Sequence, residues 1–326
     1  MAPFLNKIFS ITSPEMENLC LEIFYWQYQH NLVYRQWCQS VGIKTAAVQS
    51  IQQIPFLPVS LYKSQKITST LFLEEKIFKS SGTTRITNSI HYIKDIKLYE
   101  QSFATCFQQF YGKPEDYCII GLLPSYLEQG HSSLVYMTDA LIKQSKNVYS
   151  GFYLHDYEAL NNTLLQLQKL QQQTLLIGVT YALLDFAAAF PQPLRNTIVM
   201  ETGGMKGRRT EITRAEIHAK LKNAFSLESI HSEYGMTELL SQAYSKGNGL
   251  FNTPNWMKVL IRQEDDPFAV TDIGRGLLNI IDLANIYSCC FIAVDDWATI
   301  HPDGSFEVIG RRDNSDLRGC SLLTIN

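Results

Sequence analysis

The sequence lacks the cysteine patterns that mark zinc sites and disulfide frameworks. Its seven cysteines include no CxxC pair, and Cys289 and Cys290 are direct neighbours. An odd number of scattered cysteines is typical of reduced thiols, so we expect a protein of the cytoplasm. The N-terminal residues 1–7 include no basic segment followed by a long apolar one, which argues against a secretory leader.

Long hydrophobic runs and a strong charge bias are also missing. The longest apolar stretch, residues 175–190, contains Thr180 and Asp185 and is too short to span a bilayer. The 28 basic and 31 acidic residues give a net charge of −3, so neither nucleic acid nor an anionic membrane is expected as the main partner. Walker, HExxH, GxSxG and dinucleotide-binding motifs are absent.

What the sequence does contain is an alternation of short apolar runs with longer helical segments. The 326 residues, 45% of them hydrophobic, are enough for a sizeable core. Strands are expected at 117–123, 147–149, 174–179 and 197–200, and helices near 94–110, 132–144, 156–172 and 180–190. Strands separated by helices of about 10–15 residues predict an α/β fold with a parallel sheet and helices on its faces.

Three regions of the chain differ in character. Residues 1–53 are expected to form a helical region packed on the core, with a helix that has Ser13 as its N-cap and Pro14 and Glu15 in its first turn. Residues 54–257 hold the alternating α/β pattern. From 258 to 326 the sequence predicts a smaller β-rich subdomain, with strands at 259–261, 277–281, 291–294 and 306–309 and a hairpin turn at 301–304.

A hydroxyl-rich loop follows the extended apolar residues of 71–73 and 77–78. Its residues are Ser80, Ser81, Gly82, Thr83, Thr84 and Arg85. Such a loop can wrap an anion, because glycine lets the backbone approach closely, successive N–H groups point inward and the hydroxyls add donors. Taken alone, the cluster is more often an ordinary turn.

A pair of glycines follows the strand expected at 197–200. Gly203 and Gly204 stand there, with Lys206 close behind. In open parallel sheets, ligands collect at the carboxyl ends of strands, and paired glycines let a flat ring lie against the backbone. A structural turn explains the pair equally well.

A third segment combines an aromatic ring, a hydroxyl and a carboxylate. Its residues are Tyr234, Gly235, Met236, Thr237 and Glu238, after a short strand expected at 227–230. Tyr234 can stack on adenine, Thr237 can bond a phosphate, and Glu238 can hold the Mg²⁺ that neutralises ATP. As an alternative, Thr237 and Glu238 could start a helix.

Asp296 and Arg311 complete the set of candidate residues. A carboxylate can accept hydrogen bonds from both hydroxyls of a ribose. A nearby guanidinium can reach the sugar or the α-phosphate. Without the other motifs, adjacent acidic residues and a pair of arginines are most often a solvated turn.

The order of these motifs resembles the adenylate-forming, or acyl-activating, superfamily over about residues 55–320. Within it, residues 54–59, 202–208 and 318–323 are similar to the acyl-protein synthetases of the bacterial luminescence fatty-acid reductase system, with phenylacetate–CoA ligases as the nearest cousins. The resemblance implies the large N-terminal domain of the adenylate-forming fold. It places the nucleotide and acyl group within 54–257, and the ribose-binding and cysteine motifs within 258–326.

The resemblance also implies a reaction. A carboxylic acid, expected to be a fatty acid, reacts with Mg-ATP to give acyl-AMP and pyrophosphate, and a protein thiol then takes the acyl group. Cys320 matches the cysteine near the C-terminus that passes the acyl group to a reductase subunit. Thr83, Glu238 and Arg311 would assist catalysis, and Glu238 would bind the metal. ATP would contact residues 80–85, Gly203, Gly204, Lys206, residues 234–237, Asp296 and Arg311.

Two departures from the superfamily pattern keep alternatives open. Arg85 stands where typical members have glycine, and the mobile C-terminal domain with its adenylation lysine is expected to be absent. One alternative is a phenylacetate-ligase-like enzyme that uses CoA or an acyl carrier as an external thiol. The other is a non-enzyme that binds a nucleotide or an acyl chain without turnover.

Overall fold

A computed structural model of the chain describes residues 2–80, 88–123, 130–203 and 213–312. Five neighbouring strands of its large sheet run parallel and form what we call the parallel half. These are β4 (Cys118–Leu122), β5 (Gly151–Phe152), β6 (Thr174–Val179), β7 (Thr197–Thr202) and β8 (His231–Tyr234). The helices beside them are α4 (Ile96–Tyr111), α6 (Ser133–Ser145), α7 (Tyr157–Lys169), α8 (Thr180–Ala189) and α9 (Arg214–Phe225). This arrangement confirms the predicted α/β fold class.

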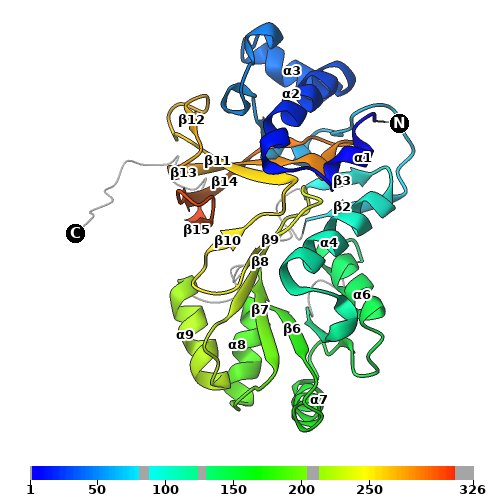
Figure 1. Ribbon diagram of the computed structural model, residues 1–326, viewed down its shortest axis with the longest axis vertical. Coiled ribbons are helices and arrows are strands. Elements are labelled where there is room, and N and C mark those ends of the chain that lie inside the picture. The colour runs from blue at the N-terminus through cyan, green and yellow to red at the C-terminus, as the bar shows by residue number, and fades with distance from the viewer. Residues whose placement is uncertain (1, 81–87, 124–129, 204–212, 313–326) are drawn as a thin grey trace, which may run out of the picture.

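Helices cover both faces of the parallel half (Figure 1). Every residue of β4 and β6 is buried. Leu176 of β6 packs with apolar residues of α7, α8 and α9, whereas its neighbours Leu175 and Ile177 pack with those of α4 and α6. Because successive side chains of a strand point to opposite faces, a strand buried on both sides is apolar along its whole length.

The other half of the sheet is antiparallel. Its strands are β9 (Ala243–Ser245), β10 (Phe251–Asn252), β11 (Met257–Arg262), β12 (Val270–Thr271), β13 (Gly274–Asp282), β14 (Phe291–Ile300) and β15 (Phe306–Arg311), with β1 (Leu57–Pro58) beside β14. The two halves form one ladder of 13 strands in the order β12-β11-β13-β14-β15-β10-β9-β8-β7-β6-β4-β5, with β1 off this path. A separate pair, β2 (Lys76–Lys79) and β3 (Ile90–Ile93), is antiparallel.

Helices α1 (Leu5–Ile8), α2 (Ser13–His30) and α3 (Leu32–Ser40) form the N-terminal end of the molecule. Phe24 of α2 contacts Phe291 at the start of β14, with ring centroids 6.4 Å apart. The N-terminal helices therefore pack on the antiparallel half.

The described chain also contains short 3₁₀ helices. They are η1 (Thr45–Ala47), η2 (Ile51–Gln53), η3 (Val59–Lys63), η4 (Pro114–Asp116) and η5 (Leu283–Asn285).

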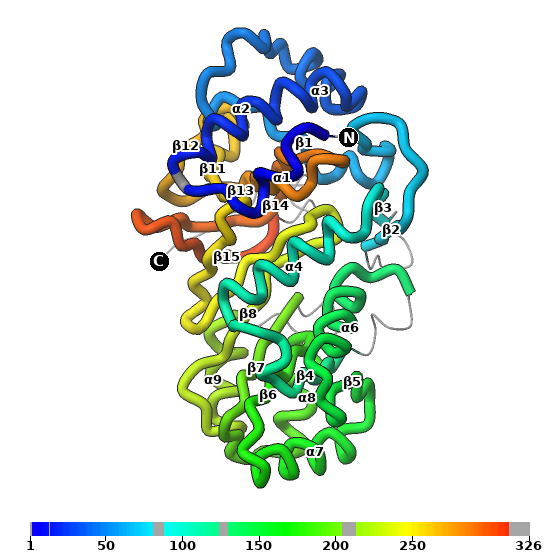
Figure 2. Tube along the Cα trace, turned by 45° about the vertical axis from the view of Figure 1, so that its right-hand side comes forward, coloured from blue at the N-terminus to red at the C-terminus, as the bar shows by residue number. Residues whose placement is uncertain are grey.

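Helix α4 joins the two halves of the sheet, and Figure 2 shows it crossing between them. Ser102 of α4 lies 3.1 Å from the hydroxyl of Ser241, which follows β8 in the chain. Trp256, just before β11, donates its indole N–H to Ser241 Oγ at 2.8 Å. These buried polar contacts fix the segment after β8 against the antiparallel half.

The predicted strands and helices of the parallel half are confirmed except for two strands. The strand expected at 147–149 is a turn region, and β5 follows it at Gly151–Phe152. The strand expected at 227–230 is also wrong, because β8 begins only at His231. The buried residues Ser232 and Glu233 of β8 are polar, so hydrophobicity placed the strand too early.

The start of α2 also differs from the prediction. Its N-cap is Thr12 rather than Ser13. The backbone N–H and the hydroxyl of Thr12 both donate to Glu15 Oε2, at 3.2 and 2.6 Å. This is a capping box, in which the acid three residues on selects the capping residue.

The division of the chain at 53/54 and 257/258 stays a prediction. Strands from β11 onward pair with one another in antiparallel fashion, but Phe251 of β10 pairs with Phe306 of β15 across the proposed boundary. Among the described helices, none combines the length and the hydropathy that crossing a bilayer requires.

Candidate functional site

The base of the hydroxyl-rich loop is a short hairpin between β2 and β3. Ser80 N–H donates to the Ser89 carbonyl at 3.0 Å, and Ser89 N–H donates to Ser80 Oγ at 2.9 Å. The Ser80 hydroxyl, one of the predicted phosphate-binding groups, is therefore engaged in closing the loop. The bonds between Ser80 and Ser89 hold the chain together at the base of the loop, as a loop that wraps an anion requires.

Tyr234, the last residue of β8, links the two halves of the sheet. Its hydroxyl donates to Asp296 Oδ2 of β14 at 2.7 Å. Its ring packs edge-on against Phe251 and Phe306, with centroids 5.9 and 5.8 Å away. Only 9% of the residue is exposed, so stacking of this ring on adenine stays a prediction.

Asp296 and Arg311 lie opposite each other on β14 and β15. Burial raises the pKa of the Asp296 carboxyl, while the Tyr234 hydroxyl and the Arg311 charge act in the other direction. Arg311 is exposed. A partly buried acid beside an exposed guanidinium is a suitable pair for a ribose and its attached phosphate.

Glu238 is buried and close to the loop between β2 and β3. The Ser89 hydroxyl lies close enough to its carboxylate to favour a lower pKa, and the charges of Arg311 and Lys63 act in the same direction. Burial is the stronger influence and raises the pKa of Glu238. The residue that closes the hydroxyl-rich loop therefore also lies close to the predicted metal ligand.

The remaining described candidates are backbone positions or lie half-buried between these groups. Gly203 has φ +69°, a conformation that L side chains rarely adopt, and its carbonyl accepts from the Thr180 hydroxyl at 2.9 Å. At Gly235 a Cβ would overlap the Glu233 carboxylate. Met236 and Thr237 are half-buried.

Several predicted site residues lie outside the described part of the chain. They are Ser81, Gly82, Thr83, Thr84, Arg85, Gly204, Lys206 and Cys320. Within the described part, the structure brings together Tyr234, Glu238, Asp296, Arg311 and the Ser80 end of the loop.

Glu201 at the end of β7 is a buried acid that the sequence analysis missed. Arg214 Nε lies 3.2 Å from its carboxylate, and the Thr180 hydroxyl donates to it at 3.1 Å. Burial alone would raise its pKa, but His218 and Arg214 outweigh burial and lower it. Arg214 also donates to the Val308 carbonyl of β15 at 3.0 Å, so this cluster joins the two halves of the sheet.

Glu233 of β8 is the second buried acid that was missed. The Thr202 hydroxyl donates to it. Burial raises the pKa of Glu233 to about 7, and this donated hydrogen bond offsets the effect only in part. A usable signal was present, because each of the two acids directly precedes a motif residue at the carboxyl end of a strand.

The side chains around Glu238 suit a Mg²⁺ ion that takes most of its ligands from water and substrate, rather than a metal ion bound by protein side chains alone. In the described residues, no group of three or more His, Cys, Asp or Glu side chains could hold a metal ion. Mg²⁺ commonly takes one or two carboxylates and completes its shell with water and substrate phosphates. The single buried carboxylate of Glu238 fits this mode of binding.

Comparison with solved structures shows the fold. The chain resembles 2-hydroxyisobutyryl-CoA ligase, solved in the postadenylation state with 2-HIB-AMP, with a TM-score of 0.61 and 11% identity over 92% of this chain and 70% of that one. It also resembles ATP-bound MatB from Rhodopseudomonas palustris, with a TM-score of 0.52 and 13% identity over 74% of this chain. The match spans about half of MatB (50%). The fold is that of the adenylate-forming ligases, as predicted.

Comparison of sequences gives the family. Long-chain-fatty-acid–luciferin-component ligase of Aliivibrio fischeri is 21% identical over 95% of this chain and 88% of that protein. The protein of the same name from Vibrio harveyi is 22% identical over 92% of this chain and 84% of its own length. The family model for LuxE, acyl-protein synthetase, matches residues 10–326. The chain thus belongs to the acyl-protein synthetase (LuxE) family of ligases.

Proposed function

We propose that this protein activates a fatty acid with ATP and then transfers the acyl group to a protein thiol. The observation that carries the proposal is the contact between distant motifs. Tyr234 and Asp296 share a hydrogen bond of 2.7 Å, and Ser89, which bonds Ser80 at the base of the hydroxyl-rich loop, lies close to the Glu238 carboxylate. Three segments that each suit part of a nucleotide therefore meet in one region.

The first step forms one phosphorus–oxygen bond and breaks another. A carboxylate oxygen of the fatty acid attacks the α-phosphorus of ATP, and the bond to pyrophosphate breaks. Asp296 would accept hydrogen bonds from the ribose hydroxyls, and Arg311, its partner across β14 and β15, would bind the α-phosphate. Residues 81–85 bind the phosphates, and Gly203, Gly204 and Lys206 border the adenine. Mg²⁺, bound through Glu238, would neutralise charge on the phosphates.

In the second step the thiol releases its proton and the thiolate sulfur attacks the acyl carbonyl. A carbon–sulfur bond forms, and the carbon–oxygen bond to AMP breaks. The six described cysteines are all buried, and burial raises the pKa of Cys20 and Cys38 to about 12. Thiols with raised pKa values and no solvent access are poor nucleophiles. This supports Cys320, which lies outside the described residues, as the acceptor. From there the acyl group would pass to a partner protein such as a reductase subunit.

The test separates the two steps. The purified protein is incubated with ATP, Mg²⁺ and labelled fatty acids of several chain lengths, and both ATP–pyrophosphate exchange and hydroxylamine-labile label on the protein are measured. We expect Cys320→Ala to abolish the label but keep the exchange, with Cys118→Ala as a matched cysteine control that keeps both. Label that survives Cys320→Ala would remove the acceptor assignment. No exchange with any carboxylate would remove the activation step, and acyl-CoA formation on adding CoA would favour an external thiol.

A further inference from the structure

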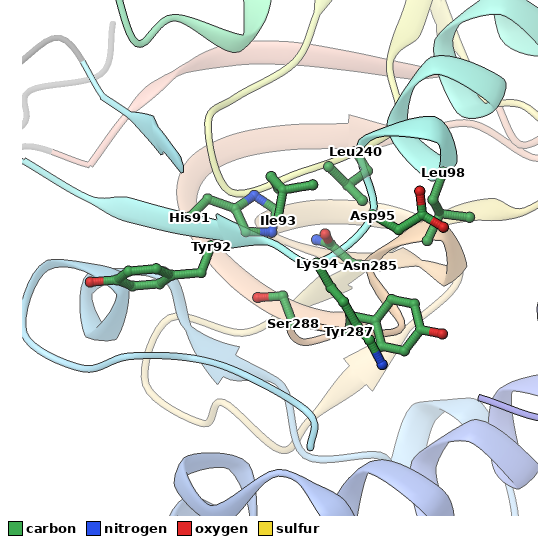
Figure 3. A pocket seen from close by; sticks show the side chains of 10 residues that line it. All are labelled: His91, Tyr92, Ile93, Lys94, Asp95, Leu98, Leu240, Asn285, Tyr287 and Ser288. Atoms are coloured by element: carbon green, nitrogen blue, oxygen red, sulfur yellow. The ribbon is translucent and has the colours of Figure 1, made fainter. Parts of the chain in front are cut away.

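A small pocket lies behind the segment that carries Glu238, and Figure 3 shows the side chains around it. Its volume of about 10 Å³ is scarcely enough for one water molecule, so it is not a site for a substrate. His91 of β3, Asn285 of η5 and Leu240 line it. Two of the lining residues, His91 and Asn285, hold the backbone on either side of Glu238 in place.

Both side chains donate to backbone carbonyls of the Glu238 segment. His91 Nδ1 lies 2.8 Å from the Thr237 carbonyl oxygen, and because a carbonyl only accepts, this nitrogen carries the hydrogen. Asn285 Nδ2 donates to the Glu238 carbonyl at 2.7 Å. The two carbonyls belong to the peptide planes on either side of the Glu238 Cα. Fixing both planes fixes φ and ψ of Glu238, and with them the direction in which its side chain leaves the backbone.

The two donors are themselves held rigidly. His91 is 1% exposed and Asn285 is fully buried. The His91 ring packs edge-on against Tyr62, with centroids 5.8 Å apart. Asn285 sits in the 3₁₀ helix η5, which is capped by the side chain of Asp282. Within the described residues, Asn285 Oδ1 is buried without a hydrogen-bond partner, which costs stability.

The same strand end connects this arrangement to the hydroxyl-rich loop. Ser89 and His91 are two residues apart, so their side chains leave the chain on the same side. Ser89 lies close to the Glu238 carboxylate and donates its backbone N–H to Ser80 Oγ at the base of the loop. The loop base and the backbone of Glu238 are thereby joined through one short segment.

We propose that His91 and Asn285 are positioning residues that aim the Glu238 carboxylate at the metal bound to ATP. This inference rests on the proposed function. The inference goes beyond the proposed function because it assigns a role to two residues that do not touch the nucleotide. Their loss acts on metal-dependent steps and leaves recognition of the fatty acid unchanged.

The test compares variants that differ in one hydrogen-bond donor. His91→Leu and Asn285→Leu remove the donor at similar size. His91→Asn keeps an N–H near the position of Nδ1 and is expected to restore most of the effect. Tyr92→Phe is the control on the same strand, since Figure 3 shows this side chain directed away from Asn285. Each is titrated with Mg²⁺ in ATP–pyrophosphate exchange, and the KM for the fatty acid is measured at saturating Mg²⁺.

We expect each leucine variant to raise the Mg²⁺ concentration for half-maximal exchange and to lower kcat by about 10- to 100-fold, as for outer-shell partners of metal sites. The KM for the fatty acid should change less than about twofold. A leucine variant with a lower unfolding midpoint but an unchanged Mg²⁺ dependence would overturn the proposal. So would failure of His91→Asn to improve on His91→Leu.

A second readout keeps this proposal separate from the proposed function. ATP binding is measured by calorimetry with and without Mg²⁺, without any fatty acid. If the wild type shows no exchange, the proposed ligase activity is wrong. If it still binds ATP more tightly with Mg²⁺, the positioning role predicts that the leucine variants lose this effect of Mg²⁺ on ATP binding. ATP binding by the wild type that does not depend on Mg²⁺ would overturn the positioning role itself.

Discussion

Two aspartates on neighbouring strands of the antiparallel half illustrate how differently a carboxylate can be used. Asp282, at the end of β13, is fully buried and accepts hydrogen bonds from three backbone N–H groups and one hydroxyl, at 2.6–3.1 Å. Asp296, on β14, is partly exposed and accepts one side-chain hydrogen bond among the described residues, from Tyr234. The acceptor positions of Asp282 are filled by protein donors, whereas Asp296 keeps acceptor positions that a ligand can use.

The difference separates a residue that builds the site from one that is free to bind a ligand. Asp282 receives N–H groups from residues 240–241, directly after the Glu238 segment, and from Ala284 in η5. A carboxylate with all its acceptor positions occupied has nothing left for a substrate. Asp296, with free acceptor positions beside Arg311, can accept hydroxyl groups of a bound sugar.

Loss of Asp282 is expected to have the largest effect on stability. Asp282→Ala leaves three buried N–H groups and a hydroxyl without their acceptor, which should lower the free energy of unfolding by at least about 4 kcal/mol. Urea unfolding followed by tryptophan fluorescence measures this. Asp282→Asn should cost roughly half as much, because the amide keeps one acceptor oxygen.

The control for Asp282 is an aspartate in the hairpin between β14 and β15. Asp303 also accepts from a backbone N–H and a hydroxyl, both of Ser305, but it is exposed. Asp303→Ala should cost less than about 1 kcal/mol. Equal losses in the Asp282→Ala and Asp303→Ala variants would show that burial and the number of donors do not distinguish the two carboxylates.

Glu233 extends the comparison to a buried carboxyl with few donors. Burial raises its pKa to about 7, against about 4.3 in an unfolded chain. Between these values the folded protein holds a proton that the unfolded chain has released. The contribution of Glu233 to the free energy of unfolding should therefore fall by about 1.4 kcal/mol per pH unit from pH 4.5 to 7, and level off above pH 7.

Glu233→Gln isolates this contribution, because the amide does not titrate. The difference in stability between wild type and Glu233→Gln should shift against the wild type by about 3 kcal/mol between pH 4.5 and pH 8. Glu201 has the opposite sign, since Arg214 and His218 help to lower its pKa against burial. Its contribution is lost only when the pH falls through that lowered value. A difference between wild type and Glu233→Gln that does not vary with pH would contradict the assignment.

The sequence predicts the parallel half of the sheet better than its polar end. Strands such as β4 and β6 are apolar throughout because both faces are covered, and helices of regular length separate them. In β8 the buried positions are Ser232, Glu233 and Tyr234. Their burial depends on partners such as Thr202 and His218 from other elements, which no local pattern reveals.

The same reasoning explains which site residues could be predicted. Tyr234, Glu238, Asp296 and Arg311 belong to short motifs with recognisable local order. His91 contacts a carbonyl 146 positions away in the chain, and Asn285 one 47 positions away. Single histidines and asparagines carry no signal for such contacts, so these residues emerge only from the three-dimensional arrangement.

Asp296→Asn should have the smallest effect on stability and a large one on activity. Burial raises the pKa of Asp296, so its charge is unfavourable in the folded state, and a neutral amide should change the free energy of unfolding by less than about 1 kcal/mol. The lost charged acceptor should lower kcat/KM for ATP in pyrophosphate exchange by about 10- to 100-fold.

Tyr234→Phe, which keeps the ring packing on Phe251 and Phe306, should lower kcat/KM for ATP by about 3- to 10-fold. If Tyr234 acts by orienting Asp296, the phenylalanine change should cost much less when it is combined with Asp296→Asn than in the wild type. Additive losses would instead assign the tyrosine a contact of its own with the nucleotide.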